Sequence, residues 1–220
     1  MFKELLYDAR SIAERDPAAK GTLEVMLLYP GFHAIFFHRF AHWFYNKKMS
    51  FLARLVSQIS RFITGIEIHP GAVIGRGLFI DHGMGVVIGE TAEIGDNCTI
   101  YHGATLGGTG KDKGKRHPTI GNNVLISAGV KILGPFKVGD NSRIGANSVV
   151  LSEVEPNTTV VGVPGRAVRR GNVRIAPSIE LDQIHNPDPV AQELCKLLMR
   201  LEHLENTVNE KAVCKSEDRQ

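Results

Sequence analysis

The 220-residue sequence lacks several features that would place it in a common class of proteins. No apolar run approaches the ~20 residues of a membrane-spanning helix, and the N-terminal run MFKELLYDAR mixes charges where a secretory signal has an apolar core. Cysteine is scarce, because only Cys98, Cys195 and Cys214 occur, too widely spaced for a disulfide framework or a zinc pattern. We therefore expect a cytoplasmic protein without a membrane partner.

An excess of one charge is also missing, since the net charge is only +3. Lys and Arg are scattered except at residues 111–116 and 166–174, and the second cluster fits either a solvated basic edge or a phosphate contact. We expect no nucleic-acid partner. The glycine-rich run is not a nucleotide P-loop, because Arg116 stands where a Ser or Thr must follow Lys115.

What the sequence does contain is an aliphatic residue at every sixth position between residues 68 and 150. A period of six fits neither a helix, which repeats at 3.6, nor a strand, which repeats at 2.0. It indicates a hexapeptide β-solenoid, in which three hexads close one coil of a triangular prism and the aliphatic side chains stack inside. The thirteen positions are Ile68, Ile74, Ile80, Ile88, Ile94, Ile100, Leu106, Ile120, Ile126, Ile132, Val138, Ile144 and Val150.

Two interruptions break this count, one of two residues after His82 and one of eight residues before His117. A solenoid that repeats only to stack has no reason to extrude loops, and both loops carry polar side chains. A histidine whose ring is held by a carboxylate is a general base near neutral pH, and an arginine such as Arg116 binds a carboxylate bidentately. These residues are therefore candidates for catalysis, with ordinary surface loops as the alternative.

Helices are expected on both sides of the solenoid. Asp16-Pro17 and Ser50 are helix-start signals, and Gly65 is a stop signal. The apolar residues between 52 and 63 recur at helical spacing and predict one buried face. His38 and His42 stand one turn apart, which favours packing over a metal site. Further along, Val190 to Val208 show the 4-3 spacing of a short coiled-coil seam.

Four runs of sequence carry a resemblance to a known family: IHPGAVIGRGLFIDHGMGVVIGETAEIGD, TLGGTGKDKGKRHPTIG, VVGVPGRAV and GFHAIFFHRFAHW. Over about residues 10–170 the chain resembles the serine O-acetyltransferases. The resemblance implies a left-handed parallel β-helix, although the general rule for parallel crossovers favours right-handed coils. We thus expect an α+β fold: a helical domain at 1–64, a left-handed parallel β-helix at 65–165, and a tail at 166–220 with a helix at about 189–208.

The resemblance also implies a function and a site. Acetyl-CoA would donate an acetyl group to the hydroxyl of L-serine, the first step of cysteine biosynthesis from serine, and no metal is needed. His82 would be the base and Glu67, where the family often has Asp, its orienting acid. Serine would contact Asp16, Asp81, Arg116 and His117. Acetyl-CoA would lie against the small residues Gly108, Ala128, Gly129 and Ala146.

Partners follow from the same resemblance. The family's active site lies between subunits of a trimer, so Arg116 and His117 would meet the His82 of a neighbour. A hexamer is in doubt because the helical domain is shorter than in the long members. L-cysteine is the expected feedback inhibitor. A tight complex with O-acetylserine sulfhydrylase is doubtful, because the sequence ends in KSEDRQ without an apolar anchor.

Three other functions compete with this one. A hexapeptide acetyltransferase acting on a sugar or antibiotic hydroxyl would keep the prism and a catalytic histidine, but it has no need of the Arg116-His117 pair. A prism-shaped carbonic anhydrase needs three histidines around zinc, and Asn122 stands where a second histidine would follow His117. A purely structural solenoid explains neither interruption. Serine O-acetyltransfer is therefore the predicted function.

Overall fold

The computed structural model describes residues 2–110 and 113–170, together with Leu197, Arg200, Leu201 and Leu204. The chain divides into two units, Met1–Asn186 and Pro187–Gln220. In the second unit the four described residues are helical. The rest of the helix predicted at about 189–208 lies outside the described residues.

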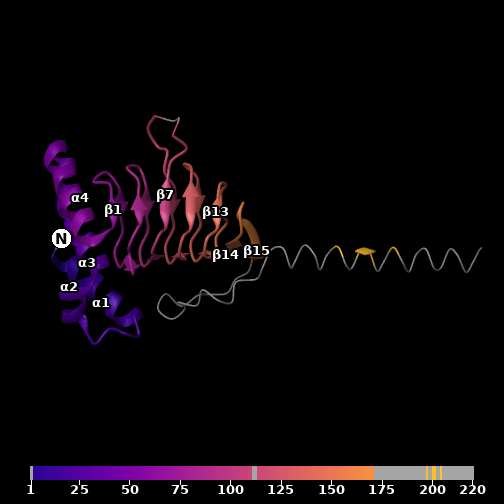
Figure 1. Ribbon diagram of the computed structural model, residues 1–220, viewed down its shortest axis with the longest axis horizontal. Helices are drawn as coiled ribbons and strands as arrows, with labels where there is room; N and C mark the ends of the chain where they lie inside the picture. Colours follow the sequence, from indigo (N-terminus) through magenta and orange to yellow (C-terminus); the bar gives the residue numbers. More distant parts are fainter. Residues whose placement is uncertain (1, 111–112, 171–196, 198–199, 202–203, 205–220) are drawn as a thin grey trace, which may run out of the picture. The chain divides into compact units, whose positions relative to one another are not determined.

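The first unit begins with helices that lie at one end of a stack of strands (Figure 1). Within the described part of the chain, no helix is long and apolar enough to cross a bilayer. The helices are α1 (Phe2–Arg15), α2 (Thr22–Leu28), α3 (Pro30–Asn46) and α4 (Ser50–Thr64).

The expected helix start at Asp16-Pro17 is wrong. Helix α1 ends just before it, and Asp16 forms a turn in which its Oδ1 accepts a hydrogen bond from the Ala18 amide at 2.8 Å. An aspartate can bond a backbone amide two residues on as readily as it caps a helix, so the sequence signal is ambiguous. The predicted stop at Gly65 is confirmed, because Gly65 adopts the left-handed conformation after α4 with φ 70°.

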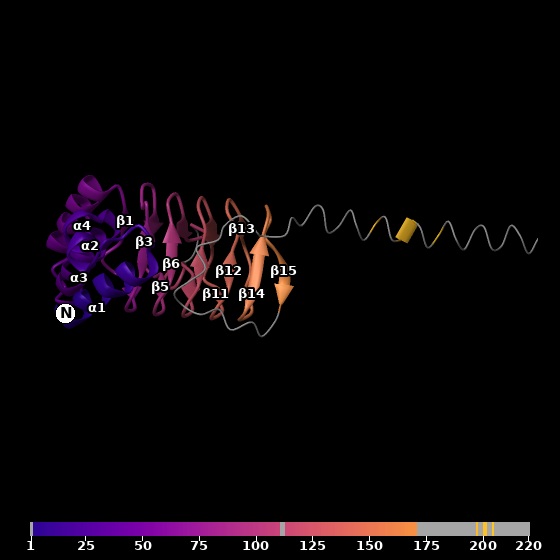
Figure 2. The ribbon, with the colours of Figure 1, turned by 90° about the horizontal axis from the view of Figure 1, so that it is seen from below.

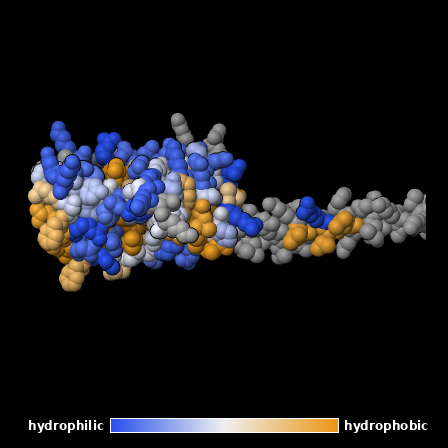
Figure 3. Space-filling view, turned by 90° about the horizontal axis from the view of Figure 1, so that it is seen from above, coloured by the Kyte–Doolittle hydropathy of each residue, from blue (hydrophilic) through white to orange (hydrophobic). Residues whose placement is uncertain are grey.

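The buried face predicted for α4 is also wrong. The apolar side chains Leu55 and Ile59 are each 45 % exposed, and the helix instead buries a face of small residues that includes Ala53 and Ser57. Small side chains let α4 approach the first coil closely, and Ser57 Oγ donates a hydrogen bond to the Ile68 carbonyl at 2.7 Å. Apolar side chains consequently remain on the surface of the helical end (Figure 3).

The strands after α4 form a parallel solenoid with three faces (Figures 1 and 2). Sheet A contains β1 (Glu67–Ile68), β4 (Val87–Ile88), β7 (Thr105–Gly107), β10 (Lys131–Leu133) and β13 (Val149–Val150). Sheet B contains β2 (Val73–Ile74), β5 (Glu93–Ile94), β8 (Thr119–Ile120) and β11 (Lys137–Val138). Sheet C contains β3 (Phe79–Asp81), β6 (Thr99–Tyr101), β9 (Leu125–Ile126), β12 (Arg143–Ile144), β14 (Thr158–Val161) and the antiparallel β15 (Arg166–Arg170).

The core confirms the six-residue period. All thirteen aliphatic positions are buried, each at most 6 % exposed, and they form one cluster along the prism. Burial of each such side chain contributes roughly 1.5–3 kcal/mol. Cys98 fills a packing position in this core, and burial raises the pKa of its thiol to about 12. It is therefore a core residue and not a nucleophile.

Successive strands pass from sheet A to B, from B to C, and from C back to A, so the prism has three corners. We call them the AB, BC and CA corners. The first interruption lies between β3 and β4, at the CA corner, and the second lies between β7 and β8, at the AB corner. The two interruptions therefore stand at different corners.

His38 and His42 lie within α3, where the sequence favoured packing. His38 is buried, and His42 Nδ1 lies 2.8 Å from the Pro70 carbonyl oxygen. Burial, reinforced by the charges of His42 and Arg39, lowers the pKa of His38 to about 3. Among the described residues, no three His, Cys, Asp or Glu side chains are grouped to hold a metal ion.

The lowered pKa of His38 predicts a pH dependence of stability. Between pH 6.5 and about 3 the unfolded chain binds a proton at this position that the folded chain does not. The free energy of unfolding should therefore fall with decreasing pH over this range, by up to about 1.4 kcal/mol per pH unit from this residue. Urea unfolding at pH 7.5 and 5 measures the slope. His38→Leu should reduce it, whereas an unchanged slope in that variant would contradict the assignment.

Candidate active site

The CA corner carries a column of side chains, one from each coil. Asp81 pairs with Tyr101 in the β3–β6 register, so the next residues, His82 and His102, lie one coil apart. The same register continues through Ala128 and Ala146 on the following coils. Because neighbouring parallel strands lie about 4.8 Å apart, the column places His82, His102 and two alanines along one edge.

His82 points outward from the CA corner at the first interruption. Its backbone adopts a left-handed conformation with φ 55°, and the Met84 amide lies 2.5 Å from the His82 carbonyl oxygen. The imidazole is 78 % exposed, and its Nε2 lies 3.7 Å from Asp81 Oδ1. His102 is exposed at the same hexad phase on the next coil, so the corner position accounts for the outward direction of both rings.

Asp16 approaches this pair from the turn after α1. Tyr29 Oη donates a hydrogen bond to Asp16 Oδ2 at 2.7 Å and fixes the carboxylate. Burial raises the pKa of Asp81, and the negative charge of Asp16 raises it further, whereas His82 and His102 oppose the shift. The structure thus brings together three predicted site residues from two distant parts of the sequence, Asp16, Asp81 and His82.

Glu67 is the first residue of β1, and its amide donates a hydrogen bond to the Val86 carbonyl at 2.9 Å. Its position is therefore at the start of sheet A, next to the CA corner. Its carboxylate Oε2 lies 3.3 Å from Nη1 of Arg61 on α4. The bond between Glu67 and His82 implied by the resemblance stays a prediction.

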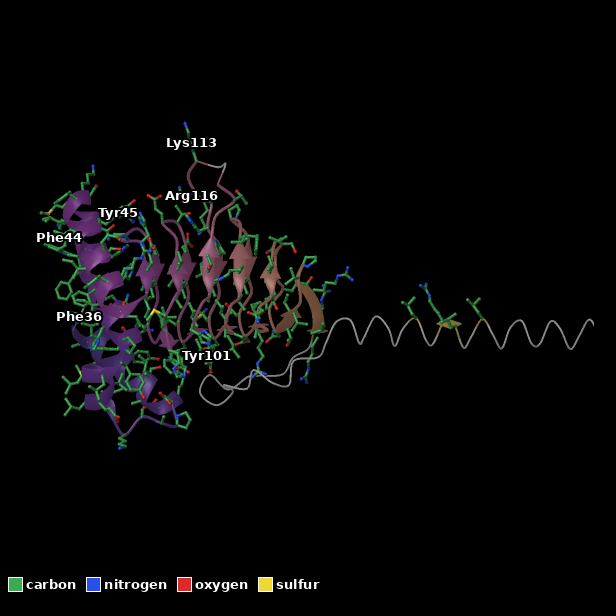
Figure 4. The ribbon with its side chains drawn as sticks, in the orientation of Figure 1. Phe36, Phe44, Tyr45, Tyr101, Lys113 and Arg116 are labelled. Carbon is green, nitrogen blue, oxygen red and sulfur yellow. The ribbon has the colours of Figure 1, made fainter. Side chains whose placement is uncertain are left out.

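Arg116 and His117 lie at the AB corner, at the base of the loop that projects from the prism (Figure 4). The Arg116 guanidinium forms an ion pair with Glu90, which also accepts a hydrogen bond from Tyr45 Oη at 3.3 Å. The hydrogen bond from Arg116 lowers the pKa of Glu90. Figure 4 shows Arg116 and Tyr101 on opposite sides of the solenoid.

His117 is buried against Gly89, at a position where any side chain would strike its ring. Its Nδ1 lies 3.1 Å from the Thr91 amide and 2.9 Å from the Thr91 hydroxyl. Because an amide can only donate, Nδ1 is the acceptor, and a neutral ring then carries its proton on Nε2. Burial, with the charge of Arg116, lowers the pKa of His117 and favours this neutral form.

The four small residues predicted to contact acetyl-CoA divide between the same two corners. Gly108 lies at the AB corner, where a side chain would meet the Arg116 backbone. Ala128, Gly129 and Ala146 lie at the CA corner. Within one chain, the predicted serine and acetyl-CoA residues therefore form two half-sites and not one closed pocket.

Known proteins share the sequence and the fold of this chain. Residues 117–152 match the family model described as bacterial transferase hexapeptide (six repeats). A serine acetyltransferase of Synechococcus elongatus is 57 % identical over 206 residues, which cover 94 % of this chain and 83 % of the relative. The chain belongs to the serine acetyltransferase family.

Two solved serine acetyltransferases share the fold. One, from Brucella abortus in complex with coenzyme A, is 48 % identical with a TM-score of 0.74, over 76 % of this chain and 67 % of that one. Another, in complex with cysteine, is 38 % identical with a TM-score of 0.80, over 84 % and 71 %. The predicted fold class, a helical region followed by a left-handed parallel β-helix, is confirmed, as is the predicted acyltransferase class.

Two side chains that lie at these corners, His102 and Glu90, were not predicted from the sequence. His102 shares the hexad phase of His82 on the next coil, so counting the repeat across the first interruption identifies it. Glu90 follows β4 and pairs with Arg116 across 26 residues, and no local spacing reveals that contact.

Proposed function

We propose that this protein transfers the acetyl group of acetyl-CoA to the hydroxyl of L-serine, giving O-acetyl-L-serine and CoA, the first step of cysteine synthesis from serine. The observation that carries the proposal is the grouping of His82, Asp81 and Asp16 at the CA corner. It provides a base and two carboxylates within one exposed corner. The carboxylates suit the ammonium of an amino acid, and the base suits its hydroxyl.

In the proposed mechanism His82 removes the proton from the serine hydroxyl as that oxygen attacks the thioester carbonyl carbon. Glu67 orients the imidazole and stabilises its protonated form. The carbon–sulfur bond then breaks, and the CoA sulfur receives the proton from His82. The proton of the serine hydroxyl thus passes through His82 to the CoA sulfur, and this step needs no metal. The acetyl group moves directly between substrates, and no covalent acyl-enzyme forms.

Acetyl-CoA is proposed to lie along the CA corner, where the column of small residues lets a pantetheine arm approach the backbone. Ala128 and Ala146 present only methyl groups on successive coils beyond His102. Gly129 adopts φ 71°, which a larger residue tolerates poorly. The thioester end would then point along the column toward His82.

The serine carboxylate is assigned to Arg116 and His117 of a neighbouring copy. Arg116 supplies a planar fork of donors that matches a carboxylate, and the neutral His117 ring supplies an Nε2–H donor. We propose a trimer in which the AB corner of one copy meets the CA corner of the next. The cytoplasmic location expected from the sequence stays a prediction, and the hexamer stays in doubt.

Incubation of the purified protein with acetyl-CoA and candidate acceptors tests the proposal. Free thiol released from CoA should appear with L-serine, and mass spectrometry should identify O-acetyl-L-serine. Thiol release with a sugar or an aminoglycoside, but not with serine, would favour the other hexapeptide acetyltransferase. Thiol release that does not depend on any acceptor would overturn both.

Free L-cysteine should inhibit competitively with serine, because the two amino acids differ by one atom and share the groups that the proposed site recognises. Initial rates at several serine concentrations measure the pattern. D-cysteine is a matched control, because it carries the same groups with the opposite arrangement at Cα. A noncompetitive pattern that survives Arg116→Ala would place the inhibitor elsewhere.

A further inference from the structure

Arg61 lies in the last turn of α4, and its guanidinium reaches the first strand of the solenoid. Arg61 Nη1 lies 3.3 Å from Oε2 of Glu67. The Arg61 side chain is 56 % exposed and that of Glu67 is 26 % exposed. The helical part of the chain thus supplies a positive charge to a carboxylate of the solenoid.

The end of α4, the start of β1 and the first interruption are joined by hydrogen bonds. The Gly65 carbonyl accepts a bond from the Gly85 amide at 2.9 Å, and the Glu67 amide donates to Val86 at 2.9 Å. Gly65 also faces Met84, within the loop that begins at His82. These hydrogen bonds therefore hold the segment that carries Arg61 and Glu67 against the loop that begins at His82.

We propose that Arg61 is a positioning residue that holds the Glu67 carboxylate at the His82 corner and offsets its charge. Arg61 binds Oε2, which leaves Oε1 to accept a bond from the His82 ring. The inference rests on the proposed roles of His82 and Glu67. In this proposal Arg61, from the helical region, positions the carboxylate that orients the His82 ring.

The charges at this corner explain why the positive charge of Arg61 matters for a base at His82. A base is useful near neutral pH only if it is unprotonated there, and neighbouring carboxylates raise the pKa of an imidazole. Without Arg61, the negative charges of the carboxylates near His82 would be less neutralised by positive charge. Several titratable and charged groups surround this corner. The acidic groups are Asp16, Glu67 and Asp81, and the Tyr29 hydroxyl lies against Asp16. The groups that can carry a positive charge are Arg61, His102 and Lys131.

A purely structural role is the competing explanation. A basic side chain in the last turn of a helix is stabilised by the helix dipole, and exposed ion pairs contribute little to stability. Arg76 and Asp96 form a matched control pair at the BC corner, 3.2 Å apart with side chains 58 % and 38 % exposed. A functional role for Arg61 must therefore appear as an effect that Arg76 does not share.

The test is the pH profile of kcat/KM for serine in Arg61→Met, Arg61→Lys and Arg76→Met. Arg61→Met should move the acid limb upward by about 0.5 pH unit, because a nearby positive charge is lost, and lower kcat about three- to tenfold through the loosened carboxylate. Arg61→Lys should restore the profile. Arg76→Met should match the wild type, and all variants should keep its thermal midpoint within a few degrees.

The same measurement in a Glu67→Gln background shows whether Arg61 acts through Glu67. If it does, Arg61→Met should lower kcat little further there, whereas the upward shift caused by the lost positive charge should remain. A profile of Arg61→Met that superimposes on the wild type, or a loss of kcat that is equally large with Gln at position 67, would overturn the inference. Glu67→Gln with a wild-type profile would instead remove the proposed His82–Glu67 pair, and an inactive wild type would remove the proposed function. Arg61→Gln repeats the test should Arg61→Met fail to fold.

Discussion

His82→Ala should lower kcat by about 10²- to 10⁴-fold, the usual contribution of a positioned general base. Its imidazole is 78 % exposed and contacts Asp81 at 3.7 Å, so its loss removes no packing from the core. The thermal midpoint and the oligomeric state should therefore stay as in the wild type. Steady-state rates at pH 7.5 with saturating serine and acetyl-CoA measure the effect.

Variants of Glu67 should lower kcat by smaller amounts than His82→Ala. Glu67→Ala should cost less than His82→Ala, and Glu67→Gln, which keeps a hydrogen-bond acceptor without the charge, should fall between Glu67→Ala and the wild type. Loss of the carboxylate removes a negative charge that stabilises the protonated imidazole, so the acid limb of kcat/KM should move to lower pH. If His82→Ala kept more than a tenth of the wild-type kcat, the base would have to be sought at His117.

Arg116→Ala should lower kcat/KM for serine by about 10- to 100-fold, because a hydrogen bond to a charged group contributes about 1.5–3 kcal/mol. The KM for acetyl-CoA should change little. Arg116→Lys keeps the charge but loses the planar fork, and should recover part of the loss. Glu90→Gln is the control for the ion pair that Arg116 makes within its own chain. Equal effects on both substrates would contradict a role in serine binding.

A mixture of the two impaired variants, His82→Ala and Arg116→Ala, tests whether the site is shared between copies. If each site takes His82 from one copy and Arg116 from the next, copies of His82→Ala and Arg116→Ala refolded together at equal amounts should regain about one quarter of wild-type activity, since two independent halves must both be intact. Each variant refolded alone should show only its own residual activity, about a tenth of the wild type or less. Activity that stays at the level of the separate variants would place the whole site within one copy.

The spacing of residues was sufficient to predict which side chains are buried in the solenoid, where one period of six dominates the sequence. Each aliphatic residue of the hexad must point inward for the coil to close, so the positions from Ile68 to Val150 could be assigned without a structure. The same logic failed for α4, where helical spacing at Leu55 and Ile59 predicted burial. Apolar spacing identifies a face but not its neighbour, and a close approach to the first coil selected Ala53 and Ser57 instead.

The sequence by itself determined the solenoid, its two interruptions and the polar residues within them, because these depend on spacing along the chain. The hexad count also assigns His82 and Arg116 to different corners, because three hexads make one coil. Only the tertiary structure decided that Asp16 joins His82 and Asp81, and that Arg61 contacts Glu67. Which helix side chain reaches a corner depends on how the helices pack on the first coil, and the spacing of nearby residues does not contain that relation.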